Sequence, residues 1–181
     1  NDGYYDDAVE KNGNHSAAGV LRGGKYSLFE AGTRVPFMVY WKGKVQPKKS
    51  DALVSQLDLF SSLASLTGSN LRADDSADLL DTFMGKSDLG RKELILEATT
   101  RTALRSGDWV MIPPYNGPAK LKAVNIEIGN SNNYQLYDLS QDISQQVNLA
   151  ESNPEKLNEM ILRFKEIRGD SYSKVKKIEL K

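Results

Sequence analysis

The chain has 181 residues, enough for one domain or for a domain with an additional fragment. Its 24 Lys and Arg residues balance 24 Asp and Glu residues, so no basic excess exists to neutralise nucleic-acid phosphates, and no apolar segment is long enough to span a membrane. We therefore expect this protein to bind neither nucleic acid nor a membrane. The absence of cysteine excludes disulfides, thiolate metal sites and a cysteine nucleophile.

The first 16 residues are rich in carboxylate and amide side chains. Oxygen ligands of this kind suit a hard cation such as calcium. The same composition is typical of a solvated loop, which is the interpretation we favour. His15, the only histidine in the chain, has no second imidazole with which to form a catalytic pair.

The stretch from Gly19 to Pro36 combines glycines with cations and contains few long apolar side chains. We therefore expect an exposed loop there, and not a buried segment. Glycine permits a close backbone approach to a ligand, and lysine acts as a point charge against the oxygens of an anion. The pattern predicts an anion site, with three candidate cations: Arg22, Lys25 and Arg34.

A phosphate-binding P-loop is one alternative, because Gly19, four residues and Gly24-Lys25 fit the G-x-x-x-x-G-K pattern. That pattern next requires Ser or Thr, whereas Tyr26 follows here. It also requires a strand before the loop and a helix after it, but polar loop residues precede it and Pro36 follows. We disfavour the P-loop.

The middle of the chain predicts a strand, a helix and a linker. The apolar run Val35–Trp41 is typical of a buried strand. Residues 51–67 place leucines at helical spacing, with Ser55 and Asp58 as a capping pair. The polar, acidic residues 69–90 predict a linker with one anchoring turn of helix.

The last part of the chain predicts a small antiparallel sheet with one helix, an α+β arrangement. Asn153 and Pro154 are typical of a helix start, and Gly169 of a helix end. The expected strands cover 94–98, 102–105, 109–112 and 134–139, with a hairpin turn at 105–108 and a possible short strand at 124–128.

Several of these segments resemble one family. The motif Leu21-Arg22-Gly23-Gly24-Lys25 followed by Phe29–Phe37 is similar to the L-R-G-G-K-x-x-x-[YF]-E-G-G-x-R-V-P segment of type I sulfatases, with only Ala31 departing from the usual glycine. The resemblance recurs, in order, at residues 57–60, 66–68, 103–109, 134–139 and 147–150. The chain is thus identified as similar to the arylsulfatase-like, formylglycine-dependent sulfatases of the alkaline phosphatase superfamily.

The resemblance implies an α/β fold with an α+β C-terminal subdomain. On this reading, residues 1–70 are the incomplete end of the mixed-sheet sulfatase domain, 71–90 are a linker, and 91–181 are the antiparallel-sheet-plus-helix subdomain. The chain would be the C-terminal portion of a longer protein, with the missing N-terminal part of the same sulfatase as its partner. An unpaired strand at 35–41 could make the piece self-associate.

The resemblance also implies a sulfuric ester hydrolase, acting on sulfated carbohydrates with calcium and a formylglycine nucleophile. Formylglycine is made within a [CS]-x-P-x-R motif, and its nearest match here, residues 152–156, lacks the arginine. Asn1-Asp2-Gly3 reverses the order of the family's S-D-N-G metal motif. We therefore expect the chain alone to be inactive and to hold neither cofactor.

By the same resemblance, Lys25 is the catalytic residue that contacts the sulfate. His15 is expected to line the substrate pocket, and Arg22 is a further candidate for substrate binding. Arg34 has a simpler interpretation, in which it neutralises a nearby carboxylate such as Glu30. No metal ligand is assigned to this chain.

The resemblance also implies a bacterial, exported protein. Two alternative functions stay open. One is a carbohydrate-binding or structural module without chemistry, which would use exposed aromatic residues to stack on sugars. The other is a phosphodiesterase or phosphonate hydrolase on the same scaffold. The aromatic candidates are Tyr4, Tyr5, Trp41, Trp109 and Tyr115.

Overall fold

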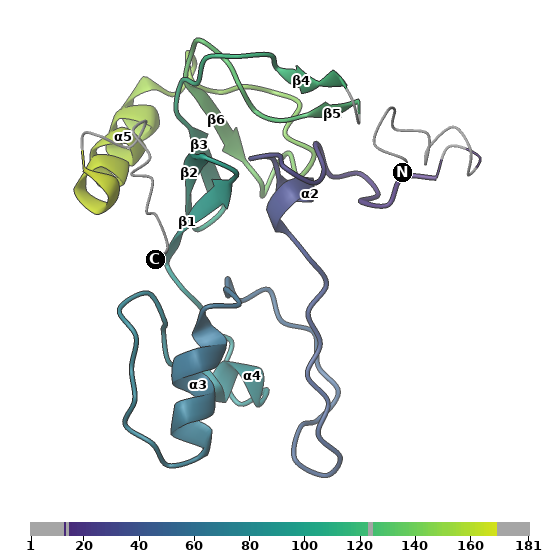
Figure 1. Ribbon diagram of the computed structural model, residues 1–181, viewed down its shortest axis with the longest axis vertical. Helices are drawn as coiled ribbons and strands as arrows, with labels where there is room; N and C mark the ends of the chain where they lie inside the picture. The colour runs from purple at the N-terminus through teal and green to yellow at the C-terminus, as the bar shows by residue number, and fades with distance from the viewer. Residues whose placement is uncertain (1–12, 14, 123–124, 170–181) are drawn as a thin grey trace, which may run out of the picture. The chain divides into compact units, whose positions relative to one another are not determined.

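The computed structural model describes Gly13, residues 15–122 and residues 125–169 (Figure 1). The chain forms two compact units, one made of the residues up to Val35 and from Ile95 onward, the other of Pro36–Leu94. These units do not test the predicted boundaries at residues 70 and 90, which concern a longer protein. No helix in the described part of the chain is long and apolar enough to cross a membrane.

A four-stranded sheet organises the first unit, with strands in the order β1–β2–β3–β6. Strands β2 and β3 form an antiparallel hairpin in which Ser106 lies opposite Trp109, and Gly107 takes the positive φ of 56° that this tight turn requires. Strand β6 pairs antiparallel with β3. The bounds are β1 Glu93–Ala98, β2 Arg101–Ser106, β3 Trp109–Ile112 and β6 Gln135–Asp138.

Helix α5 (Pro154–Arg168) packs on this sheet and completes the core. Leu104, Met111 and Leu136 of the sheet form one buried cluster with Met160 and Phe164 of the helix. The predicted antiparallel sheet with a C-terminal helix is thus confirmed. A second antiparallel pair, β4 (Lys120–Leu121) with β5 (Ile126–Glu127), lies beside the short helix α2 (Glu30–Thr33) in Figure 1.

The expectation of an unburied loop from Gly19 to Pro36 is wrong for its middle. Leu28 and Phe29 are 0% and 2% exposed, and Glu30 is 2% exposed. The Leu28 amide donates to the Ile128 carbonyl at 3.3 Å, which joins this segment to the chain after β5. These apolar residues are too few to show a period in the sequence, yet they anchor the loop in the core.

The second unit contains α3 (Asp58–Leu66) and α4 (Leu80–Phe83). The predicted helix therefore begins at residue 58, not 51. The predicted pairing of Ser55 with Asp58 is present, because the Asp58 carboxylate accepts a hydrogen bond from the Ser55 amide at 2.8 Å. The prediction of a buried strand at 35–41 is wrong for this chain: the segment is exposed and forms no strand. Among the described residues no strand pairs with it.

Candidate anion-binding loop

The bends of the loop at residues 22–32 require glycine at two positions. Gly23 has φ +86°, and a Cβ built there would overlap the Ser27 side chain. A Cβ at Gly32 would overlap the Ser27 carbonyl oxygen. The glycines thus allow the chain to fold tightly over Ser27, and they set the path on which Lys25 lies.

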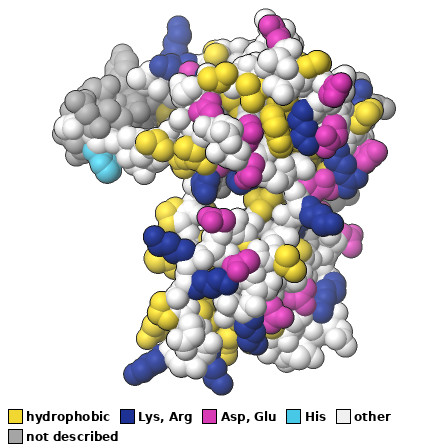
Figure 2. Space-filling model, turned by 180° about the vertical axis from the view of Figure 1, so that it is seen from behind, with side chains coloured by type: hydrophobic (Ala, Val, Ile, Leu, Met, Phe, Trp, Pro, Cys, Tyr) yellow, Lys and Arg dark blue, Asp and Glu magenta, His cyan; other side chains and the backbone are white. Residues whose placement is uncertain are grey.

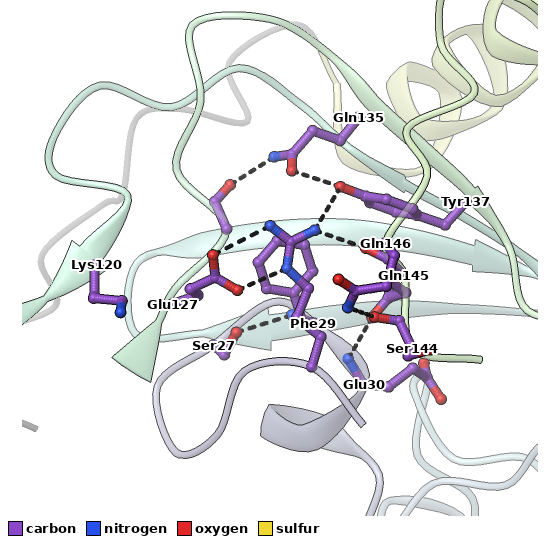
Figure 3. Close-up of polar contacts among 12 residues, drawn as sticks. Ser27, Phe29, Glu30, Lys120, Glu127, Gln135, Tyr137, Ser144, Gln145 and Gln146 are labelled. Atoms are coloured by element: carbon purple, nitrogen blue, oxygen red, sulfur yellow. Dashed lines mark hydrogen bonds and ion pairs between the residues drawn. The ribbon is translucent and has the colours of Figure 1, made fainter. Parts of the chain in front are cut away.

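Arg22 connects the start of this loop to β5, to β6 and to the chain after β6. Its Nε donates to Glu127 Oε2 at 2.8 Å, and its Nη1 donates to the Gln145 carbonyl at 2.7 Å and to the Tyr137 hydroxyl at 3.4 Å. The guanidinium also lies 4.1 Å from the centre of the Phe29 ring. In Figure 3, Glu127, Tyr137 and Gln145 come from separate segments and converge beside Phe29.

The electrostatics keep this cluster charged near neutral pH. The hydrogen bond from Arg22 outweighs burial and holds the pKa of the Glu127 carboxyl below its ordinary value. Burial raises the pKa of the Tyr137 hydroxyl, which therefore stays protonated. The structure thus gives Arg22 a structural role in this chain, and its predicted role in substrate binding stays a prediction.

Glu30 is the second buried centre of charge. Its carboxylate pairs with Arg34 at 3.2 Å and with Arg105 at 3.4 Å, and its own amide donates to Gln145 Oε1 at 2.8 Å. The sequence interpretation of Arg34 as a partner for Glu30 is confirmed. The contacts of Glu30 therefore connect the end of the loop to Arg105 of β2 and to Gln145.

Arg101, which lies in none of the motifs that the sequence shows, holds the tip of the loop. Its guanidinium donates to the Tyr26 carbonyl at 2.9 Å, the Ile128 carbonyl at 2.9 Å and Asn130 Oδ1 at 2.7 Å. Tyr26 has φ 77°, an unfavourable conformation for a residue other than glycine. No local pattern in the sequence indicates this contact, because Arg101 and Tyr26 are 75 residues apart.

Lys25, between the Arg22 and Arg101 contacts, is exposed. Its Nζ lies 5.1 Å from the centre of the Tyr26 ring. Within the described residues, no carboxylate forms an ion pair with it. The loop therefore presents one uncommitted ammonium group, while Arg22 and Arg34 are both paired with carboxylates.

His15 is also exposed, and in the described part of the chain no hydrogen bond or ion pair joins it to Lys25 or Arg22. Its predicted place in a pocket stays a prediction. The acidic residues 1–12 lie outside the described residues. Across residues 13, 15–122 and 125–169, no group of three His, Asp or Glu side chains could hold a metal ion.

Of the aromatic residues proposed for sugar stacking, one is buried and another packs against the core. Tyr115 is buried, and its hydroxyl donates to the Thr102 carbonyl at 2.7 Å. Trp109 packs against the core cluster, with Lys156 Nζ 5.8 Å from its ring centre. Trp41 is exposed, whereas Tyr4 and Tyr5 lie outside the described residues. Burial thus rules out Tyr115 as a stacking residue.

Comparison with known proteins identifies the family. Residues 5–69 match the family model named Sulfatase. An N-acetylgalactosamine-6-O-sulfatase from Bacteroides thetaiotaomicron is 43% identical over 163 residues. The chain belongs to the sulfatase family. The sulfatase match includes both the candidate anion-binding loop and α3.

The other matches agree with this sulfatase assignment. Bovine arylsulfatase A is 34% identical over 100 residues, which cover 51% of this chain and 20% of the enzyme. A solved structure from a study of glycosaminoglycan metabolism by B. thetaiotaomicron matches with a TM-score of 0.84 and 40% identity, over 90% of this chain and 35% of that one. A Pseudoalteromonas sulfatase, at 18% identity and a TM-score of 0.65, shares the fold.

This chain matches only part of the length of its relatives. The match to the Bacteroides N-acetylgalactosamine-6-O-sulfatase covers 88% of this chain but only 32% of the relative. Thus the chain spans about a third of the length of that enzyme.

Proposed function

We propose that this chain is part of a longer sulfatase that hydrolyses sulfate esters of carbohydrates, and that Lys25 binds the sulfate group. The family membership and the 43% identity to an N-acetylgalactosamine-6-O-sulfatase support the reaction and the substrate class. The formylglycine and calcium that the sulfatase resemblance implies would come from outside the described residues. Export from the cell is part of the same proposal.

The observation that carries the role of Lys25 is its exposed ammonium group, which pairs with no carboxylate among the described residues, on a loop held at both ends. Arg22 and Arg101 fasten the backbone on either side of it, with contacts of 2.7–2.9 Å. A cation fixed in this way needs little reorganisation to stabilise negative charge that develops on sulfuryl oxygens. His15 and Arg22 are proposed as neighbours of the substrate by family resemblance alone.

The test is Lys25→Ala in the longer protein, assayed with a 6-sulfated N-acetylgalactosamine substrate. We expect kcat/KM to fall about 100-fold, or roughly 3 kcal/mol, because one charge-stabilising donor is lost. Lys86→Ala is the matched control, since this exposed lysine lies in the other unit, 3.8 Å from Asp81. An unchanged kcat/KM in a folded Lys25→Ala protein would contradict the proposed role.

A further inference from the structure

Tyr26 occupies a backbone position that ordinarily selects glycine. The amide of Ser27 donates to the carbonyl of Gly24 at 3.0 Å, which closes a turn whose two central residues are Lys25 and Tyr26. Tyr26 is the second of these and has φ 77°. A positive φ at this place in a turn is usual for glycine or asparagine and is strained for a bulky side chain. The other residues of the Gly19–Pro36 stretch with positive φ are both glycines.

Packing does not explain why a tyrosine stands at this position. Its side chain is 41% exposed, whereas Leu28 and Phe29, shortly after it, are buried. The ring lies outside the apolar cluster between the sheet and α5, and the hydroxyl forms no hydrogen bond with another described residue. Backbone strain persists where the surroundings impose it, here through the hydrogen bond from Arg101 to the Tyr26 carbonyl, and it collects at functional sites.

The Tyr26 ring lies beside the Lys25 ammonium group. Lys25 Nζ is 5.1 Å from the ring centre, within the range of a cation–π interaction. A carboxylate in the same place would neutralise the ammonium group and would repel an anionic ligand. The ring attracts the cation but carries no formal charge, so it restrains the ammonium group and leaves its charge available.

Other surface lysines of the chain are paired with acids. Lys48 lies 2.8 Å from Asp88, and Lys86 lies 3.8 Å from Asp81. On the face drawn in Figure 2, lysine and arginine side chains are interspersed with aspartate and glutamate. A ring in place of a carboxylate thus distinguishes the surroundings of Lys25 from those of these two lysines.

We propose that Tyr26 is a positioning residue for Lys25, and that its ring holds the ammonium group in place for the sulfate of the substrate. This inference rests on the proposed function, in which Lys25 binds that sulfate. A lysine side chain is a flexible four-carbon stem, and its freedom must be lost when the sulfate binds. The ring removes part of that cost in advance, while Arg101 maintains the turn that carries both residues.

Proton NMR of the 181-residue chain tests the contact itself. Protons over the face of an aromatic ring resonate upfield, so the ε-methylene protons of Lys25 should lie upfield of those of Lys86. Tyr26→Gly should remove this difference. Equal chemical shifts of the two lysines in the wild-type chain would overturn the proposal.

Kinetics and melting of the longer protein separate a positioning role from a purely structural one. Tyr26→Gly is expected to lower kcat/KM for a 6-sulfated N-acetylgalactosamine substrate about fivefold, the scale of one exposed cation–π contact. It should not lower the melting temperature, because glycine adopts a positive φ without strain. Tyr26→Phe keeps the ring and should retain most of the activity. An unchanged kcat/KM in Tyr26→Gly, or an equal loss in Tyr26→Phe, would overturn the proposal.

The matched control is Asn125→Gly. Asn125 is also exposed and has φ 51°, so the change places glycine at a second position with positive φ. It is expected to leave kcat/KM unchanged. A loss equal to that of Tyr26→Gly would show that glycine substitution, and not removal of the ring, lowers activity, and would overturn the proposal.

A double substitution decides whether Tyr26 acts through Lys25. In the Lys25→Ala protein, adding Tyr26→Gly should change kcat/KM less than about twofold, because the ring has no ammonium group left to hold. A further fivefold loss in that background would overturn the proposal, because the ring would then act on the substrate directly. An unchanged kcat/KM in Lys25→Ala alone would contradict the role of Lys25, whereas independent effects of the two substitutions would contradict only the role of Tyr26.

Discussion

At the scale of single residues, the loop holds one cation, Lys25, that pairs with no described carboxylate, whereas its neighbours Arg22 and Arg34 are paired. Arg22 is paired with Glu127 and Arg34 with Glu30, and Arg101 donates hydrogen bonds to carbonyl and amide oxygens. A paired guanidinium holds the segments that it contacts in place, because its hydrogen bonds have defined directions. Lys25 contributes charge, because no described carboxylate competes for it.

We predict that Arg101→Ala releases the tip of the loop. The change removes hydrogen bonds to the Tyr26 and Ile128 carbonyls, and Tyr26 then has less to hold it at positive φ. Unfolding in urea should show a loss of about 2 kcal/mol, typical of hydrogen bonds to a charged group.

Hydrogen exchange of residues 24–28 in the same Arg101→Ala protein should accelerate. Arg163→Ala is the control, because its ion pair with Glu166 on α5 lies at the surface. Unchanged exchange in the loop would show that Arg101 does not hold it.

At the scale of elements, α3 is anchored by an ion pair on its buried side. Asp58 is 0% exposed and accepts from Arg91 Nε at 2.9 Å, from the Ser55 amide at 2.8 Å and from the Ala77 amide at 2.9 Å. Burial alone would raise the pKa of this carboxyl, but these hydrogen bonds outweigh it and hold the pKa below its ordinary value. One carboxylate thus joins the helix start to two other segments of the unit.

We predict that Asp58→Asn costs the chain about 3 kcal/mol of stability at pH 7, since it leaves Arg91 without its charge partner. The wild-type contribution should be fully present above the unfolded-state pKa of roughly 4 and should disappear as the pH falls through the lower folded-state pKa. The gap between wild type and variant in urea unfolding should therefore close in acid.

The control for Asp58→Asn is Asp88→Asn. Asp88 pairs with Lys48 at 2.8 Å, but its side chain is 67% exposed, so little stability should be lost at any pH. Equal costs for the two substitutions would mean that the buried position of Asp58 does not matter.

At the scale of the whole molecule, the two units differ in what stabilises them. The sheet and α5 bury a common apolar cluster, whereas the Pro36–Leu94 unit relies on buried polar groups and ion pairs. Apolar burial is the main favourable term in folding, and a buried ion pair adds little net stability. The second unit should therefore be the less stable of the two in the absence of an additional partner.

We predict that hydrogen exchange of the 181-residue chain separates the two units. Amides of β2 and β3 should show the protection of global unfolding, and those of α3 should exchange through a smaller opening. Equal protection in α3 and β3 would contradict the prediction and would indicate that the units unfold together.

Much of the fold could be predicted because its cause is local. The hairpin at Gly107 and the start of α5 at Pro154 follow from turn and capping preferences that act within a few residues. The pairing of Arg34 with Glu30 is equally local, because the two residues are four apart in the sequence. For the candidate site, the sequence predicted the loop and its cations.

The sequence by itself thus determined the family, the sheet-and-helix order and the cationic loop. Only the tertiary structure decided which cation stays free, since Arg22 meets Glu127 and Arg101 meets Tyr26 across 105 and 75 residues. It also decided that the apolar residues 37–41 remain exposed here. An apolar run in the sequence indicates a strand that is stabilised by pairing with other strands. Whether that strand is buried depends on other segments, and none of the described segments pairs with it.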